Sequence, residues 1–316
     1  MNLNNSRKIL KRVIPFVKFR NVFFLITLAY ILAGGILLST IGLNLGIDFQ
    51  SGSRVEVSAE EPLTEEQVRS DFEAVEADLE PDDITLGGEN NTIASARFIG
   101  ELSQEEIAAV QTYFEEEYGS IPNTSTVSPQ VGQELAQNAF ISVLIASVGL
   151  IIYITIRFQF LYGVASIIAL LHDAFFIIGF FSLLQVEVNV PFIAAVLTIV
   201  GYSINDTIVT FDRIRENMPQ TEEIESFEDL AEVVDVSLNQ TLTRSINTVL
   251  TVVFAAAALF IFGGEGIRSF SLALLVGLVA GTYSSIFLAA QLWMIWNWKK
   301  IKRDREKAPA EEEPES

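Results

Sequence analysis

The stretch Thr198–Asn217, which reads TIVGYSINDTIVTFDRIREN, decides the fold class of this chain. It begins as apolar sequence of the kind found in membrane spans, and then places Asn205, Asp206 and Thr207 among aliphatic residues. A carboxylate inside a bilayer costs several kcal/mol unless it is paired or hydrated, so such groups usually mark an ion or substrate path. The sequence therefore predicts a membrane protein that moves something, or that couples an ion to movement.

Several apolar runs have the length of about 20 residues that a membrane helix requires. The runs are Val22–Ile41, Ala139–Ile156, Leu161–Leu184, Val188–Phe211, Ile246–Gly263 and Ser269–Trp296, and the fourth overlaps the stretch quoted above. The first is too long for a secretory signal and lacks a small-residue cleavage site, so we expect it to be retained. The chain is thus predicted to be an α-helical membrane protein with six transmembrane helices, the first over 22–41 and the others bundled over 139–296.

Basic residues predict the orientation of these spans. Six precede the first span, within 1–21, and six lie in the tail 297–316. Because an even number of spans puts both ends on one side, and positive charge favours the cytoplasm, both termini are expected to be cytoplasmic. The acidic, proline-containing end after Lys307 is expected to be disordered.

The segment 42–138 between the first two spans is the large polar piece of the chain, and it is expected to lie outside the cell. It holds 21 acidic residues against three arginines, and so carries most of the formal net charge of −20. Such a charge suits a solvated surface in a saline or alkaline exterior, or a face for a basic partner.

Strand and helix patterns alternate within 42–138. Strands are expected at 54–59, 83–86, 92–99 and 120–127, and Pro122 predicts that the last strand lies at a sheet edge or starts late. Helices are expected at 64–79 and 103–118, opened by capping-box patterns at Thr64–Gln67 and Ser103–Glu106. The order βαββαβ predicts a ferredoxin-like α+β domain.

A short charged loop is expected over 212–243, between the fourth and fifth spans. Its segment Glu222–Val236 has the pattern of an amphipathic helix, which would lie along the membrane surface or pack against a neighbour. Asp212, Arg213 and Arg215 begin this loop at the inner interface, where the membrane topology alone explains two arginines.

Three ionisable residues are expected in the inner half of consecutive spans. With a rise of about 1.5 Å per residue, Asp173 lies roughly 15 Å into the third span, and Asp206 about 8 Å from the inner surface. Arg244 begins the fifth span, so its long side chain can reach towards Asp206. Short connections make these helices neighbours.

A carboxyl group near a movable cation can bind and release protons, because its ionisation depends on that charge. Asp206 and Arg244 are therefore candidates for ion coupling, with Asn205 and Thr207 placed to orient water. The other interpretation is a static ion pair between spans. For Asp173 a structural role is favoured over an ion-carrying one: it adjoins His172, and adjacent helical side chains point about 100° apart.

Other kinds of chemistry are disfavoured. The chain has no cysteine and one histidine, so thiolate and multi-histidine metal sites are excluded. We expect no metal, no cofactor and no nucleic-acid partner. An intramembrane aspartyl protease using Asp173 and Asp206 would need a Gly-x-Gly-Asp loop, whereas the sequence before the second acid is Tyr-Ser-Ile-Asn.

Several motifs in order resemble the SecD/SecF family of the resistance-nodulation-division superfamily. They are GLNLGIDF at 42–49, SPQVG at 128–132, His172-Asp173, GYSINDT at 201–207, FDRIREN at 211–217 and TLTRSIN at 241–247. The Asn205-Asp206 form favours the SecF branch. Gly46, Asp48 and Phe49 belong to the opening motif, which usually continues with two glycines. Here it continues Gln50-Ser51-Gly52, one glycine short.

The resemblance implies a six-span half of a twelve-span assembly in a bacterial inner membrane. A SecD-like subunit would supply the other half, next to a SecYEG-type translocon and its accessory subunits. Ion motive force would then draw a translocating polypeptide outward, with Asp206 and Arg244 in the ion pathway. The chain is expected to be a transport subunit and not an enzyme. Two alternatives stay open: a stand-alone exporter of small hydrophobic molecules, and a passive assembly factor.

Overall fold

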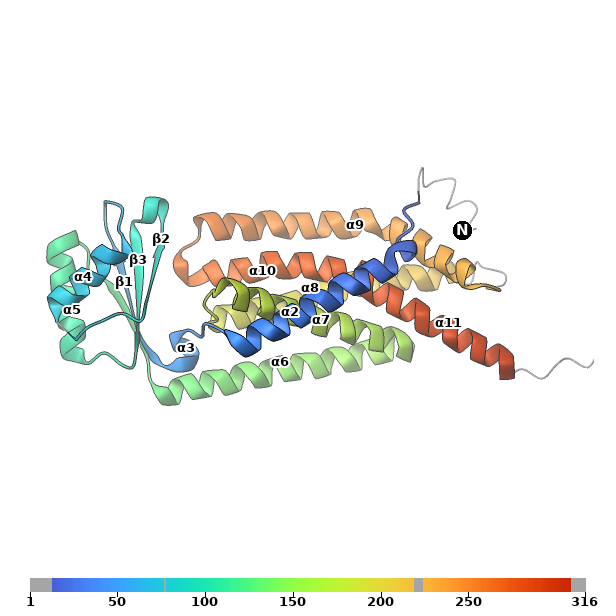
Figure 1. Cartoon of the computed structure of the whole chain (residues 1–316), viewed down its shortest axis with the longest axis horizontal. Coiled ribbons are helices and arrows are strands. Elements are labelled where there is room, and N and C mark those ends of the chain that lie inside the picture. The colour runs from blue at the N-terminus through green and yellow to red at the C-terminus, as the bar shows by residue number, and fades with distance from the viewer. Residues whose placement is uncertain (1–12, 77, 219–223, 308–316) are drawn as a thin grey trace, which may run out of the picture.

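The computed structural model describes residues 13–76, 78–218 and 224–307. A bundle of long helices occupies most of the molecule, and a smaller α+β domain lies beyond one end of the bundle (Figure 1). Within the described ranges, six helical runs are long and apolar enough to cross a membrane. The predicted number of spans is confirmed.

The spans are longer than the apolar runs that predicted them. After a short turn of helix, η1 (Val17–Phe19), come α2 (Arg20–Thr40), α6 (Pro129–Arg157), α7 (Phe160–Leu184), α8 (Val190–Asn217) and α9 (Phe227–Phe262). The last span is one continuous run of α10 (Glu265–Tyr283), a π-helical segment η4 (Ser284–Ala289) and α11 (Ala290–Lys307). Most of the helices therefore continue through charged residues beyond the ends of the apolar runs.

The predicted loop over 212–243 is wrong. Helix α8 continues to Asn217 and α9 already begins at Phe227, so the expected surface helix Glu222–Val236 is largely the first part of a span. Residues 219–223 lie outside the described residues. A capping box formed by Ser226 and Asp229 starts α9, and no glycine or proline interrupts it before Phe262, so nothing in the sequence stops the helix earlier.

Helix α8 lies against α10, and two glycines allow this close approach. A methyl group added at Gly277 would lie 2.2 Å from Ile199 Cδ1, and one at Gly281 would lie 3.1 Å from Ser203 Cβ. The Gly277-xxx-Gly281 pattern therefore packs two spans together, as small residues do in membranes. Helix α6 buries far less of its surface against the rest of the chain than α8 or the last span does.

The α+β domain contains β1 (Gly52–Ser58), α4 (Glu65–Val75), β2 (Asp83–Gly87), β3 (Ile93–Ile99), α5 (Gln104–Tyr118) and β4 (Asn123–Val127). A short 3₁₀ turn, η2 (Glu89–Asn91), joins β2 to β3. The sheet order is β2-β3-β1-β4 and every neighbouring pair is antiparallel. The ferredoxin-like prediction is confirmed, including the edge position of β4. Both helices pack on one face of the sheet, where Phe72 contacts Phe98 and Phe114 in the core.

One of the two predicted capping boxes is complete. At α5 the Ser103 hydroxyl accepts from the Glu106 N–H, and the Ser103 N–H donates to the Glu106 carboxylate at 2.6 Å. These bonds hold the pKa of Glu106 below its usual value. At α4 only half of the box forms: Thr64 accepts from the Gln67 N–H, but the Gln67 side chain donates to Tyr118 Oη instead.

The segment after the first span joins the domain to the bundle. It contains the short helix α3 (Ile47–Gln50), which lies against the start of α6. Asp48 Oδ2 accepts from the Val190 N–H at 2.8 Å and so caps the first turn of α8. A methyl group at Gly46 would lie 2.1 Å from Glu187 Oε1, so a side chain there would displace the Glu187 carboxylate that pairs with Arg54. Phe49 packs with the outer part of the helical core.

The missing glycine of the opening motif has a structural consequence at Ser51. This residue has φ 61° and ψ 152°, and Gly52 follows with φ 148°. Backbone of this kind is essentially restricted to glycine, and a side chain there costs about 1–3 kcal/mol. Ser51 therefore has a backbone conformation that a glycine would adopt without strain.

We expect Ser51→Gly to raise the thermal unfolding midpoint of the protein in detergent. Removing the side chain relieves the strain, and the greater freedom of glycine in the unfolded chain offsets roughly 0.4–1 kcal/mol of that gain. Ser58→Gly, in the same strand region but with ordinary backbone angles, should lower the midpoint. A lower midpoint for Ser51→Gly would show that the serine is not strained.

Candidate functional site

The carboxyl group of Asp206 lies inside the helical bundle, on the face of α8 that meets α9 and α10. Asp206 Oδ1 accepts a very short hydrogen bond from the Ser245 hydroxyl of α9. Asp206 Oδ2 is buried and has no hydrogen-bond partner within 3.5 Å, although the Ser285 hydroxyl of η4 also approaches this carboxyl group. A buried polar oxygen without a partner is costly unless water or an ion reaches it. A carboxylate oxygen of this kind can accept a proton or a cation.

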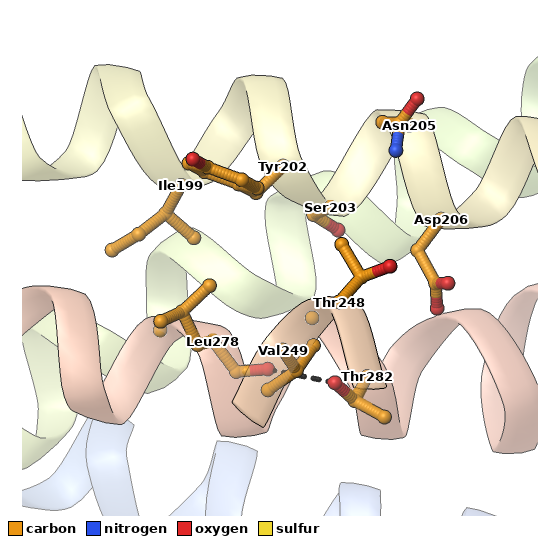
Figure 2. Close-up of a pocket in the computed structure, with 11 residues that line it drawn as sticks. Ile199, Tyr202, Ser203, Asn205, Asp206, Thr248, Val249, Leu278 and Thr282 are labelled. Carbon is orange, nitrogen blue, oxygen red and sulfur yellow. Dashed lines mark hydrogen bonds between the residues drawn. The ribbon is translucent and has the colours of Figure 1, made fainter. Parts of the chain in front are cut away.

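A small pocket with a cavity volume of about 20 Å³ lies beside this carboxyl group, between α8, α9 and α10. Figure 2 shows the Asp206 carboxyl pointing towards α10, whereas the side chain of Asn205 points to the other side of α8. Thr248 and Thr282 add hydroxyl groups to a lining that is otherwise largely apolar. The pocket has room for about one water molecule beside Asp206.

Asp173 lies on α7 and is buried, with three hydrogen bonds to its carboxylate. Oδ2 accepts from Ser203 of α8 at 2.5 Å and from Ser284 of η4 at 2.9 Å, and Oδ1 lies 2.9 Å from His172 Nδ1. The carboxylate therefore ties three helical segments together. This arrangement agrees with the structural role favoured from the sequence. It also places a second acid inside the bundle, within a cluster of polar side chains that we call the polar centre: Asp173, Ser203, Asp206, Thr207, Ser245, Ser284 and Ser285.

The π-helical segment brings two consecutive hydroxyl groups into this centre. Ser284 donates to Asp173, while Ser285 Oγ lies 2.8 Å from Thr207 Oγ1, one residue after Asp206. In an α-helix neighbouring side chains diverge by about 100°, and π turns inside α-helices are frequent at functional sites. The wider turn lets adjacent serines contact different polar groups of the centre.

His172 corrects an expectation about adjacent residues. Its ring and the Asp173 carboxylate were expected to diverge, yet Nδ1 and Oδ1 are within hydrogen-bonding distance and both side chains are buried. The ring lies against two aromatic rings from other spans, at centroid distances of 5.0 Å from Tyr30 and 5.8 Å from Tyr283. These rings hold the imidazole back towards the carboxylate.

The remaining candidates for ion coupling differ in position. Thr207 is buried and belongs to the polar centre, whereas Asn205 is exposed on α8. Arg244 is also exposed, on α9 one residue before Ser245, and within the described ranges no ion pair under 4.0 Å joins it to Asp206. The static ion pair considered from the sequence is absent from this structure.

The charged residues at the inner end of α8 form ion pairs. Asp212 accepts from Arg157 of α6 at 3.0 Å and lies 2.8 Å from Arg215. Arg213 pairs with Glu216 at 2.9 Å. The pairs link the ends of α6 and α8 on the surface, away from the polar centre, so topology and helix pairing account for these residues.

Four hydroxyl groups of the centre were not expected from the sequence: Ser203, Ser245, Ser284 and Ser285. A signal for the last two was present, because Thr282–Ser285 is a run of four hydroxyl-bearing residues inside an apolar span. No hydrogen bond joins Asp173 and Asp206 among the described residues, and no group of three or more metal-ligating side chains occurs there.

Comparisons with known proteins agree with these features. The family described as "Protein export membrane protein SecD/SecF, C-terminal" matches residues 107–299, and the "SecD/SecF GG Motif" matches residues 36–63. The protein translocase subunit SecF of Alicyclobacillus acidocaldarius is 42% identical, over 89% of this chain and 92% of that protein.

Two longer proteins are also similar. The protein translocase subunit SecDF of Bacillus subtilis is 54% identical over 92% of this chain, which spans 39% of that protein. The crystal structure of SecDF from Thermus thermophilus superposes with a TM-score of 0.79 at 33% identity, over 92% of this chain and 39% of that one. The matched lengths, the six spans and the motif order lead to one assignment: the chain belongs to the SecD/SecF protein-export family.

Proposed function

We propose that this chain is the SecF-type subunit of a Sec protein translocase in a bacterial inner membrane, with both termini in the cytoplasm. Its match along nearly the whole length of SecF relatives supports this assignment. The chain spans 39% of the length of the two SecDF relatives, and a SecD-like partner would supply the remainder of such an assembly. A SecYEG-type translocon and the translocating polypeptide would complete the assembly.

The proposed mechanism couples ion flow to export through Asp206. The observation that carries it is the buried, unpartnered Asp206 Oδ2 beside a pocket between three spans. Binding of an ion there would change the charge that α8 presents to α9 and α10, and so would favour a different packing of these helices. Movement along the membrane potential supplies about 2.3 kcal/mol per charge per 100 mV.

Arg244 would act as the cation that approaches and leaves this carboxyl group. In this structure the side chain is exposed and not paired with Asp206, while the next residue, Ser245, donates to Asp206. A small rotation of α9 would exchange one contact for the other. Thr207 and Asp173 would stabilise the packing of the polar centre. The side chain of Asn205 would reach the ion only if α8 also rotated.

The named relatives are translocase subunits, which gives the small-molecule exporter no support. We also propose that the chain carries no catalytic activity of its own. An aspartyl protease would need Asp173 as a second catalytic acid beside Asp206, but the Asp173 carboxylate already accepts hydrogen bonds from Ser203 and Ser284.

Replacement of Arg244 tests the proposed function. We expect Arg244→Met to abolish stimulation of export by an ion gradient in inverted membrane vesicles, while the chain still co-purifies with its SecD-like partner. The exposed residue Lys302 gives the control, since Lys302→Met removes a positive charge far along α11 and should leave stimulation intact. Full stimulation in Arg244→Met would contradict the coupling role, and loss of the complex would instead indicate a structural role.

A further inference from the structure

A second site lies at the end of the bundle opposite the α+β domain. A groove with a cavity volume of about 500 Å³ runs between the start of α7 and α11. Its lining combines three cationic side chains, one amide and three apolar residues: Lys299, Lys300, Arg303, Gln159, Phe160, Leu161 and Trp296. The volume falls within the range of small-molecule sites, about 300–1,000 Å³. No carboxylate lines the groove.

The cations in this groove differ from the arginines nearby. Arg157 and Arg215 each pair with the carboxylate of Asp212. In contrast, no ion pair within 4.0 Å is found for Lys299 or Lys300 in the described part of the chain, and Arg303 has only Asp304 at 3.9 Å. The groove therefore has an unbalanced positive charge. The membrane topology explains basic residues at this end of the bundle, but it does not explain why three of them line one groove.

The groove also has an apolar side. Phe160 is 75% exposed, and Ile156, at the end of α6 just before it, is 82% exposed. In a membrane these side chains face acyl chains, and Trp296 lies where aromatic rings commonly meet the headgroup region. No side chain caps the N-terminus of α7, so its first N–H groups add to the positive potential beside Phe160.

We propose that this groove binds the phosphodiester headgroup of an anionic phospholipid such as phosphatidylglycerol. Lys299, Lys300 and Arg303 would surround the phosphate, while Phe160 and Trp296 would contact the glycerol and the upper acyl chains. The lipid would join α7 to α11, whose preceding π segment carries Ser284 and Ser285. The inference does not depend on the direction of transport or on the identity of the partner subunit.

The test compares lysines that line the groove with one that does not. The full chain is purified in a mild detergent, delipidated and titrated with phosphatidylglycerol or phosphatidylcholine, and bound lipid is counted by native mass spectrometry. A basic residue near a membrane surface contributes about 1 kcal/mol to binding of anionic lipid. We therefore expect Lys299→Gln and Lys300→Gln each to weaken phosphatidylglycerol binding about fivefold, and Lys302→Gln, on the same helix but outside the lining, to weaken it less than twofold.

Three results would overturn the proposal. Equal losses in Lys299→Gln and Lys302→Gln would mean that general surface charge holds the lipid. Equal binding of phosphatidylcholine would remove the requirement for a net negative headgroup. If inorganic phosphate displaced the lipid at millimolar concentration, or raised the thermal midpoint as much as the lipid does, the groove would be a site for a soluble anion. These variants are exposed, so their folding is not at risk.

Discussion

Asp206→Asn is expected to remove the stimulation of export by an ion gradient completely while leaving the fold intact. Asparagine has nearly the same shape, and its carbonyl oxygen can still accept from the Ser245 hydroxyl. Its amide cannot ionise, so the position of the unpartnered Oδ2 no longer binds a proton or carries a negative charge. The work available from the gradient, about 2.3 kcal/mol per charge per 100 mV, is then lost.

The measurement is export of a labelled precursor into inverted membrane vesicles, with and without an imposed gradient. Proton and sodium gradients are applied separately, so the same experiment identifies the coupling ion. Glu216→Gln is the matched control, because it removes a carboxylate from the exposed end of the same helix and should retain stimulation. Persistent stimulation in Asp206→Asn would leave the chain as a passive assembly factor.

Gly277→Leu is expected to have the largest effect on stability. A methyl group at this position would already lie 2.2 Å from Ile199 Cδ1, so a leucine forces α8 and α10 apart. Overpacking of a well-packed interior typically costs about 1–3 kcal/mol, and separation of two spans belongs at the upper end. Because Asp206 lies on α8 and Ser285 follows α10, coupling should fall together with stability.

Gly149→Leu provides the control for this prediction. Gly149 also lies within a span, α6, but no atom lies within 4 Å of a methyl group added there. We expect its thermal midpoint in detergent to stay near that of the unchanged protein. A second substitution, Ile199→Ala, should partly rescue Gly277→Leu by making room. Similar midpoints for Gly277→Leu and Gly149→Leu would mean that the α8–α10 contact is not tight.

Most of the architecture could be read from local patterns. Uninterrupted apolar length predicted the six spans, and the order of strand and helix patterns predicted the ferredoxin-like domain, because both depend on residues near one another in the chain. The errors occurred where the helices end. The charged residues predict a loop over 212–243, but polar side chains are compatible with a helix once it leaves the apolar layer. Only a proline, a glycine or a cap would end the helix there.

The polar centre could be predicted only in part. The acids were found because an ionisable residue in an apolar run is unusual at any position. Their partners were not found, because Ser245 and Ser285 come from helices that are distant in the sequence, and serine is common in membrane spans. The contact between His172 and Asp173 also escaped prediction, since two aromatic rings from other spans determine the direction of the imidazole.

By itself the sequence determined that this chain crosses a membrane six times, carries an acidic ferredoxin-like domain and contains two intramembrane acids. Periodicity and composition suffice for these features because each arises within one segment. Only the tertiary structure decided that the Asp173 carboxylate accepts hydrogen bonds at both oxygens, whereas Asp206 Oδ2 lies buried beside a pocket without a hydrogen-bond partner within 3.5 Å. It also decided that Arg244 forms no ion pair with Asp206. Those differences depend on how α7, α8, α9 and the π segment pack, and on contacts between side chains that lie far apart along the chain.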